Sequence, residues 1–466
     1  MSNNLENNQN LTTRSRTVLM AVLLSGAFAA ILNQTLLATA IPHIMNDLKL
    51  DADVAQWLQS VFMLVNGIMI PITAFLINKF STRSLFFTAL SLFGLGTLIC
   101  GISPNFSILL AGRILQAAGA GIVMPLMQTI LFLTYPKSER GKAMGMFGLV
   151  ISFAPAIGPT LSGWFVEIYP WRGLFWIIVP IVVIDIIVAY FILRNVTKTT
   201  NPSLDMTSIV LSTLGFGGLL YGFSAAGNSG WLSVSVILPI IVGALALFFF
   251  IRRQNKLDEP ILEFGVFKNK VFTLSTLLGM IVFMAMIGGA VILPIFMQTM
   301  LGFSAMESGM MLLPGAILMG IMSPVTGRLY DRYGARWLAI IGLLIVTVTT
   351  LMFSNLDTAT TFTYLAVVNT FRMLGVAMVM MPVTTAGLNQ ISNTLVPHGT
   401  AMNNTMRQVA GAVGTALLVS IMTGTMKPEE GVEGMIHGVN VSFFFAATLA
   451  FIGFILAFWL REPKEN

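Results

Sequence analysis

Four ionisable side chains lie deep inside long apolar stretches of this chain: Arg113, Asp185, Arg372 and Arg407. On insertion scales a charge at the centre of a membrane span costs about 2.5–3.5 kcal/mol, so each residue is expected to face a partner or a cavity. Asp185 is the only acid this deep, and a buried carboxyl group can carry a proton between two sides of a membrane. All four residues are therefore candidate functional residues. Asp185 is equally suited to holding a neighbouring helix, and Arg113 to bonding backbone carbonyls.

Residue patterns for catalysis or ATP hydrolysis do not occur in the sequence. His43, His398 and His437 are far apart and Cys100 is the only cysteine, so neither a metal site nor a disulfide framework is predicted. A phosphate-binding G-x-x-x-x-G-K-[ST] loop is missing, so ATP is not expected to drive the chain directly. The sequence predicts a protein that is not an enzyme and has no cofactor.

The composition places the chain in a lipid bilayer. Of its 466 residues 56% are hydrophobic and only 9% are charged, and the mean hydropathy is +0.85. A soluble domain carries about 25% charged residues, so too little polar surface is present to cover a globule in water. The net charge is +6, but the basic residues are scattered through short loops, so nucleic acid is not an expected partner.

Hydropathy predicts fourteen spans, each long enough to cross about 30 Å of hydrocarbon. They cover approximately residues 18–42, 56–78, 84–103, 106–134, 143–168, 173–194, 204–226, 231–252, 270–298, 306–327, 336–355, 359–386, 400–425 and 439–460. The first span is too long for a cleavable signal and runs into a polar loop and a second span.

The chain repeats itself at a nearly fixed offset. Pro71 and Pro324 are 253 residues apart, while Pro42 and Pro294 are 252 apart. Spans one to six therefore match spans nine to fourteen, as in transporters whose binding site lies between two related bundles. The predicted organisation is an N-terminal tail (1–17), a six-helix bundle (18–195), two inserted helices (196–253), a linker (254–269), a second six-helix bundle (270–461) and a C-terminal tail (462–466).

The basic residues predict the orientation of the chain in the membrane. With the N-terminus in the cytoplasm, only Lys49, Arg172 and Lys427 of the 25 Lys and Arg residues lie in outer loops. Positive loops stay on the cytoplasmic side, and an even number of spans places both termini there. We therefore expect a multi-pass protein of the cytoplasmic membrane.

A loop in the second half carries a specific motif, Gly327-Arg-Leu-Tyr-Asp331-Arg332-Tyr-Gly334-Ala-Arg336. It resembles the G-x-L-x-D-R-x-G-x-R/K motif of the major facilitator superfamily, and over nearly its full length the chain is similar to the fourteen-helix drug:proton antiporters. The resemblance implies a gating role for this loop, in which Asp331 accepts from a helix N-terminus or pairs with a cytoplasmic Arg in one gate state. A loop that only sets topology is the alternative. The first-half copy is degraded, with Asn78 where the motif has Asp.

Two further motifs fit the same resemblance. Arg113-Ile-Leu-Gln116 is similar to the family's R-x-x-Q pattern, which implies that both residues lie beside the proton site. Asp185 and, second, Glu307 are the candidate proton carriers. The antiporter motif appears in the fifth span and implies export, its two prolines and small residues forming a hinge or seal; its residues are Pro155, Gly158, Pro159 and Gly163. A plain packing kink remains the alternative.

Polar residues within other spans are candidates for lining the substrate cavity, namely Asn33, Gln34, Asn66, Arg372, Asn403, Asn404, Arg407 and Gln408. The amides are equally suited to joining helices to one another. Asn33 stands where the family often has Asp, and a neutral amide cannot carry a proton. This departure keeps open a translocator of a lipid or metabolite that is uncoupled or differently coupled.

The resemblance implies a major facilitator fold, with two pseudo-symmetric six-helix bundles and two inserted helices. It implies a monomeric multidrug exporter that works by alternating access. Inward proton movement would drive hydrophobic or amphiphilic small molecules outward, so the proton gradient takes the place of a cofactor. A channel is less consistent with the repeated halves.

Overall fold

The computed structural model of the chain describes residues 13–463, except 198 and 201. The first half comprises α2 (Thr13–Leu48), α3 (Ala52–Lys79), α4 (Thr82–Ile102), α5 (Phe106–Thr134), α6 (Arg140–Ile168) and α7 (Gly173–Ile192). The inserted pair comprises α8 (Met206–Ser229) and α9 (Val234–Gln254). The second half comprises α10 (Lys270–Ile295), α11 (Ala305–Tyr333), α12 (Ala335–Met352), α13 (Phe362–Asn389), α14 (Val396–Thr425) and α15 (Gly431–Ala457).

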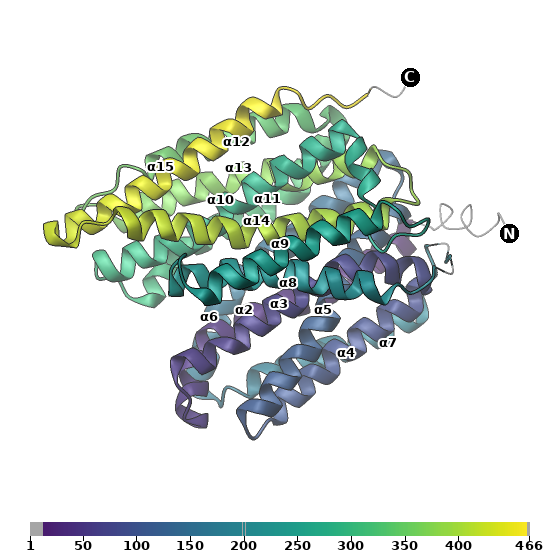
Figure 1. Ribbon diagram of the computed structural model, residues 1–466, viewed down its shortest axis with the longest axis horizontal. Helices are drawn as coiled ribbons and strands as arrows, with labels where there is room; N and C mark the ends of the chain where they lie inside the picture. Colours follow the sequence, from purple (N-terminus) through teal and green to yellow (C-terminus); the bar gives the residue numbers. More distant parts are fainter. Residues whose placement is uncertain (1–12, 198, 201, 464–466) are drawn as a thin grey trace.

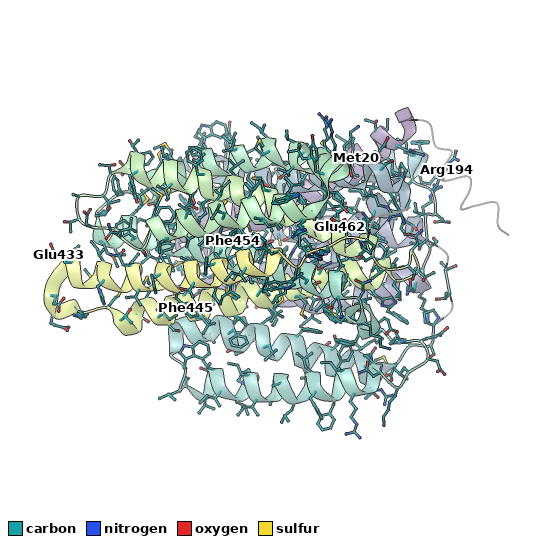
Figure 2. The ribbon with its side chains drawn as sticks, turned by 90° about the horizontal axis from the view of Figure 1, so that it is seen from above. Met20, Arg194, Glu433, Phe445, Phe454 and Glu462 are labelled. Atoms are coloured by element: carbon teal, nitrogen blue, oxygen red, sulfur yellow. The ribbon has the colours of Figure 1, made fainter. Side chains whose placement is uncertain are left out.

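Fourteen helices in the described part of the chain are long and apolar enough to cross a membrane. The predicted all-α membrane fold, with two six-helix halves and an inserted pair, is therefore confirmed. Both ends of the described chain lie at the same end of the helices (Figure 1), which we call the terminus side. The opposite end, where Glu433 lies in Figure 2, is called the distal side.

The inserted pair forms an outer layer along one side of the molecule (Figure 2). Close contact between α8 and α9 depends on glycine, because a Cβ added at Gly218 would lie 2.7 Å from the Pro239 carbonyl oxygen. Trp57 of α3 stacks on Tyr221, with ring centroids 6.0 Å apart, and Trp231 Nε1 donates to Ser420 Oγ of α14 at 2.5 Å. The pair thus contacts both halves.

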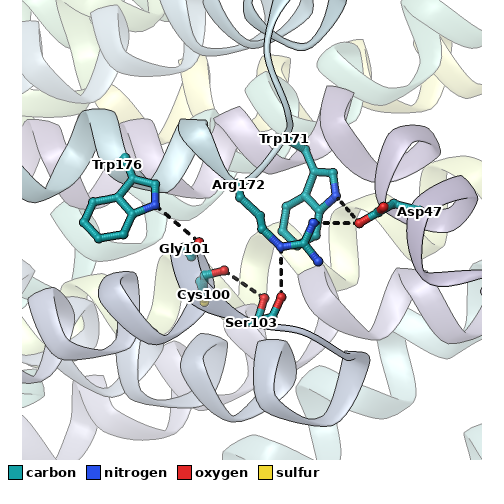
Figure 3. Close-up of polar contacts among 7 residues, drawn as sticks. All are labelled: Asp47, Cys100, Gly101, Ser103, Trp171, Arg172 and Trp176. Carbon is teal, nitrogen blue, oxygen red and sulfur yellow. Dashed lines mark hydrogen bonds and ion pairs between the residues drawn. The ribbon is translucent and has the colours of Figure 1, made fainter.

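A polar cluster joins three helix ends at the distal edge of the first half (Figure 3). Asp47, near the end of α2, accepts from Arg172 Nη1 at 2.7 Å and from Trp171 Nε1 at 3.1 Å. Arg172 Nε also donates to the Ser103 carbonyl oxygen after α4, at 2.9 Å. The hydrogen bonds from Arg172 and Trp171 lower the pKa of Asp47. The cluster ties α2, α4 and the start of α7 into one body.

A second ion pair fixes the terminus-side end of the inserted pair and gives a testable pH dependence. Asp205 accepts from Arg253 Nε at 2.6 Å and Nη2 at 2.9 Å, and this pairing lowers the pKa of Asp205 to about 2. Because the folded-state pKa is below the ordinary value, the pair stabilises the fold above about pH 4, and its contribution disappears as the pH falls toward 2.

We expect Asp205→Asn to lower the thermal unfolding temperature at pH 7 by a small amount, since the ion pair lies at the surface and Arg253 is partly exposed. The difference from wild type should shrink as the pH falls from about 4 toward 2. Thermal melts of the purified chain across this range check the prediction. Asp258→Asn, at an exposed acid in the nearby linker, should change little at any pH, and an equal effect of both changes would contradict the assignment.

Candidate functional site

The two halves meet most closely where α6 crosses α11 on the terminus side. A Cβ added at Gly327 would lie 2.2 Å from the Gly141 carbonyl oxygen, and one added at Gly145 would lie 2.5 Å from the Ser323 carbonyl oxygen. No side chain fits at either position. Asp331 Oδ1 accepts from the Gly141 N–H at 2.7 Å and Oδ2 from the Lys142 N–H at 2.9 Å. The first of the two contacts expected for Asp331, with a helix N-terminus, is thus present at the start of α6.

Other hydrogen bonds between the halves lie at the same end of the molecule. Arg140 of α6 donates from Nη1 to Asn389 Oδ1 at 2.8 Å and from Nη2 to Asn393 Oδ1 at 3.3 Å. One layer deeper, Asn404 Nδ2 donates to Gln128 Oε1 at 2.8 Å. A further pair is formed by the hydroxyl groups of Thr129 and Thr400, at 2.8 Å. These contacts close the terminus side of the space between the halves.

His398, at the start of α14, ties both halves to the linker. Its Nδ1 accepts from the Glu263 N–H at 3.2 Å, while Nε2 lies 2.9 Å from the side-chain amide of Asn78. The atom of Asn78 that lies 2.9 Å from Nε2 is Nδ2, so the two ring nitrogens contact the linker on one side and α3 on the other. The buried imidazole therefore joins α3, the linker and α14.

Helices α6 and α11, which meet closely on the terminus side, separate toward the distal side. Gly163 near the end of α6 and Gly309 near the start of α11 each have open space where a Cβ would lie, with no atom within 4 Å. Gly158, by contrast, packs against α2, since an added Cβ would lie 2.1 Å from Thr35 Oγ1. Gly163 therefore makes no close contact with α11, although the preceding Ser162 is fully buried on another side of α6. The chain is closed on the terminus side, and this helix pair is splayed on the distal side.

The remaining motif residues have local contacts. Pro155 and Pro159 lie within one continuous helix, α6. Gly334 ends α11 at a φ of 76°, in the region that favours glycine. The guanidinium groups of Arg332 and Arg336 lie over the rings that follow them, 5.2 Å from Tyr333 and 5.7 Å from Trp337.

Arg113 is the centre of a buried network in the first half. Nη1 donates to Asn33 Oδ1 of α2 at 2.8 Å and to Gln116 Oε1 at 3.0 Å, and Nε donates to the Leu58 carbonyl oxygen of α3 at 3.2 Å. Its guanidinium lies 4.3 Å from the centre of the Phe62 ring. Asn33 is only 2% exposed. It is thus enclosed rather than facing an open cavity, because its oxygen is the acceptor for Arg113.

Asp185 lies elsewhere in the first half. Its Oδ1 accepts from Ser25 Oγ of α2, and Oδ2 is enclosed beside Gly26 without a partner among the described residues. Ser25 and Asn33 are eight residues apart on one helix, which corresponds to about 12 Å. The structure therefore brings Arg113, Gln116 and Asn33 together but leaves Asp185 outside this group. Hydropathy gave the depth of Asp185 but not the side of α7 on which it lies.

Glu307, on the distal side, caps the N-terminus of its own helix. Its Oε2 accepts from both the N–H and the hydroxyl of Ser304 at 2.8 Å, while its own N–H donates to Ser304 Oγ at 3.1 Å. This reciprocal capping box begins α11. The carboxylate is thus occupied by the helix N-terminus in this state.

The two buried arginines of the second half have different surroundings. Arg372 Nη2 donates to Asn369 Oδ1 at 3.0 Å, and Nη1 reaches the Ala285 carbonyl oxygen at 3.4 Å. Ala285 lies 252 residues after Asn33 and is its repeat equivalent. In the second half a backbone carbonyl oxygen therefore takes the place of the Asn33 side-chain amide as the acceptor. Arg407 Nη2 donates to the Met380 carbonyl oxygen at 3.2 Å and to Thr384 Oγ1, both on α13.

The predicted cavity amides divide into two groups. Asn403 accepts from Thr276 Oγ1 of α10 at 2.9 Å, and Asn404 joins the halves through Gln128. The side chains of Gln34, Asn66 and Gln408 make no hydrogen bond with other described residues, which leaves them free to meet a ligand or water. Gln128 and His398 were missed as site residues by sequence reasoning, although a glutamine deep in an apolar span is itself a signal.

Comparison with known proteins gives consistent matches over the chain. Residues 23–415 match the family model described as Major Facilitator Superfamily. The chain is 54% identical to the uncharacterized MFS-type transporter YcnB of Bacillus subtilis (strain 168), over 97% of this chain and 96% of the relative. It is 42% identical to the lincomycin resistance protein LmrB of the same organism, over 96% of each. The crystal structure of the MFS transporter FucP in the outward conformation has a TM-score of 0.62 at 16% identity, covering 96% of this chain and all of that one.

Proposed function

The chain belongs to the major facilitator superfamily and is a multi-pass membrane transporter of small molecules rather than an enzyme, and we propose that it exports hydrophobic or amphiphilic compounds in exchange for protons. The relatives named for lincomycin resistance and multidrug export support this substrate class. We further propose that the chain acts as a monomer in the cytoplasmic membrane, without a cofactor, and that the terminus side faces the cytoplasm.

The one-sided closure carries the proposal. Hydrogen bonds between the described parts of the two halves lie on the terminus side, while α6 and α11 separate on the distal side. A channel needs a path open at both ends, whereas alternating access needs a gate that forms at one end and breaks when the other closes. The geometry supports an outward-facing state whose cytoplasmic gate includes Asp331, Arg140 and Gly327.

Asp185 is the proposed proton carrier. No cation pairs with its carboxyl group among the described residues, and one of its oxygens is enclosed without a donor. A buried carboxyl group that is not neutralised by a cation is the kind that exchanges protons during transport. Because it lies between α7 and α2, its protonation can change how these helices pack, while Arg113 and Gln116 hold α2 against α3 and α5.

The test is substrate uptake into inverted vesicles with and without an imposed pH gradient, using lincomycin as the probe because of the resemblance to LmrB. We expect uptake to rise at least about tenfold with the gradient and Asp185→Asn to abolish the rise, since the amide cannot exchange a proton. Asp258→Asn is the matched control. Gradient-independent uptake in the wild type would refute antiport, and a retained response in Asp185→Asn would move the proton site elsewhere.

The second candidate is a translocator that is not proton-coupled. The observation in its favour is that Arg113 pairs with no carboxylate among the described residues and instead bonds Asn33 at 2.8 Å. The same vesicle assay separates the two, because an uncoupled translocator equilibrates its substrate equally with or without the gradient.

A further inference from the structure

Arg407 differs from the other two buried arginines in where its unpaired N–H groups lie. The unpaired Arg113 Nη2 and Arg372 Nε are both fully enclosed. Arg407 uses only Nη2 to bond the protein, and its Nε and Nη1 have no acceptor among the described residues yet are not enclosed. These donors therefore reach accessible space although the residue as a whole is only 5% exposed.

The neighbouring backbone leaves room beside this guanidinium. A Cβ added at Gly279 of α10 would meet only Arg407, with Nε at 3.7 Å and Nη2 at 3.8 Å, and nothing else within 4 Å. Most other helical glycines of this chain have closer neighbours, as at Gly327 and Gly145. The space beside Gly279 thus accommodates at least a methyl-sized group and is bordered by the guanidinium of Arg407.

The surroundings of Arg407 offer hydrogen-bond donors and no negative charge. The ion pairs within the described residues are Asp47 with Arg172, Asp205 with Arg253, and Lys427 with Glu430, so Arg407 has no carboxylate within 4.0 Å. One turn away, Asn403 Nδ2 is enclosed without an acceptor, as is Gln128 Nε2 on the facing α5. A buried charge without a counter-ion is costly, so a ligand that brings an anion here gains from neutralising it.

The position along the helix also fits a substrate site. Arg407 is the twelfth residue of α14 (Val396–Thr425), which places it about 17 Å from the terminus-side end of a 30-residue helix. Substrate sites of transporters with repeated halves lie near the bilayer midplane, between the halves. Asn404, about one turn earlier on α14, already bonds Gln128 of the first half, so this layer lies at the interface.

Resting on the proposed export function, we propose that Arg407 binds the anionic group of its substrates, so that the chain prefers amphiphiles carrying a carboxylate over neutral analogues. The free Nε–H group, which borders the space beside Gly279, would donate to the carboxylate there, with Nη2 on the same edge of the guanidinium. The apolar part of the substrate would lie toward the open distal side.

Fluorescence titration of the purified full-length chain in detergent tests this, with dansylglycine as the carboxylate probe and dansylglycinamide as the neutral probe. We expect the wild type to bind dansylglycine about tenfold or more tightly than the amide, since a hydrogen bond to a charged group is stronger than one between neutral groups. Arg407→Gln should remove this preference and leave the affinity for the amide unchanged. Arg407→Lys should retain part of it, and Gly279→Val should weaken the binding of both probes by filling the space.

Arg252→Gln, at an exposed arginine of α9, is the matched control and should preserve the preference. Equal affinities of the two probes in the wild type would overturn the proposal, and this comparison remains decisive even if Arg407→Gln does not fold. If a folded Arg407→Gln variant lost the same factor of affinity for both probes, that result would also overturn the proposal. Because binding in detergent needs no proton gradient, failure here leaves the vesicle test of antiport unaffected, and failure of antiport leaves this binding test unaffected.

Discussion

Gly327→Val should nearly abolish transport by preventing the terminus side from closing. Even a single Cβ at this position would lie 2.2 Å from the Gly141 carbonyl oxygen, and the two branches of valine add to this clash. The helices must separate, which also pulls Asp331 away from the N–H groups of Gly141 and Lys142. Overpacking of about 3 kcal/mol corresponds to a change of more than about a hundredfold in the population of the closed gate.

Labelling of a single introduced cysteine measures this change of population. Gly309→Cys places a thiol on the distal side in open space, while the native Cys100 is buried. In the present state an impermeant maleimide should react quickly with the introduced thiol. When Gly327→Val is added, the distal side should close more often, and labelling should slow together with substrate uptake.

Gly424→Val is the control for a bulky residue in a helix, because Gly424 has nothing within 4 Å of an added Cβ. It should alter neither labelling nor uptake. If Gly327→Val retained wild-type uptake and labelling, the contact between α6 and α11 could not be part of the gate.

The fold could be predicted from the sequence because long apolar stretches leave few alternatives in a membrane. Each span must satisfy its backbone as a helix, and the 253-residue offset shows that the second half repeats the first. The first predicted span, 18–42, lies inside a longer helix, α2, that runs from Thr13 to Leu48. Hydropathy stops at polar residues such as Asn46 and Asp47, whereas the helix continues beyond the apolar part.

The site was only partly predictable, because hydropathy gives the depth of a residue and not the direction of its side chain. Arg113 and Gln116 are three residues apart and share a helix face, so their contact follows from spacing. Asp185 is at a comparable depth, but the rotation of α7 points it to Ser25. Pairings between halves, such as Gln128 with Asn404, depend on how two separate bodies meet. No local pattern in the sequence contains that information.

Arg113→Leu should have the second large effect, a loss of stability, because the Arg113 side chain joins α5 to α2 and α3. The variant leaves the Asn33 and Gln116 side-chain oxygens and the Leu58 carbonyl oxygen without their donor. Each buried acceptor left unpaired costs about 1–3 kcal/mol, so we expect a loss of about 3 kcal/mol of stability after the relief from burying a charge. Thermal melts of the purified variant measure this loss.

Arg372→Leu is the matched comparison, since Arg372 occupies roughly the place of Arg113 in the second half and has two acceptors among the described residues, one of them at 3.4 Å. It should destabilise the chain less than Arg113→Leu. A smaller effect of Arg113→Leu would mean that the buried charge, and not the three bonds, dominates the energetics of the site.

Transport by the Arg113→Lys variant shows whether the Arg113 network only holds the helices of the first half in place or also couples proton movement to transport. Lysine keeps the charge but, as a compact ammonium, cannot reproduce the planar fork that reaches Asn33, Gln116 and Leu58 together. If the network only braces the first half, gradient-driven uptake and gradient-free exchange of substrate across the vesicle membrane should fall by the same factor. If the network transmits the protonation of Asp185 through α2, gradient-driven uptake should fall by at least about tenfold more than exchange, because exchange needs no proton movement. We expect the second result, since Asn33 and Ser25 lie on the same helix and link Arg113 and Asp185 through it.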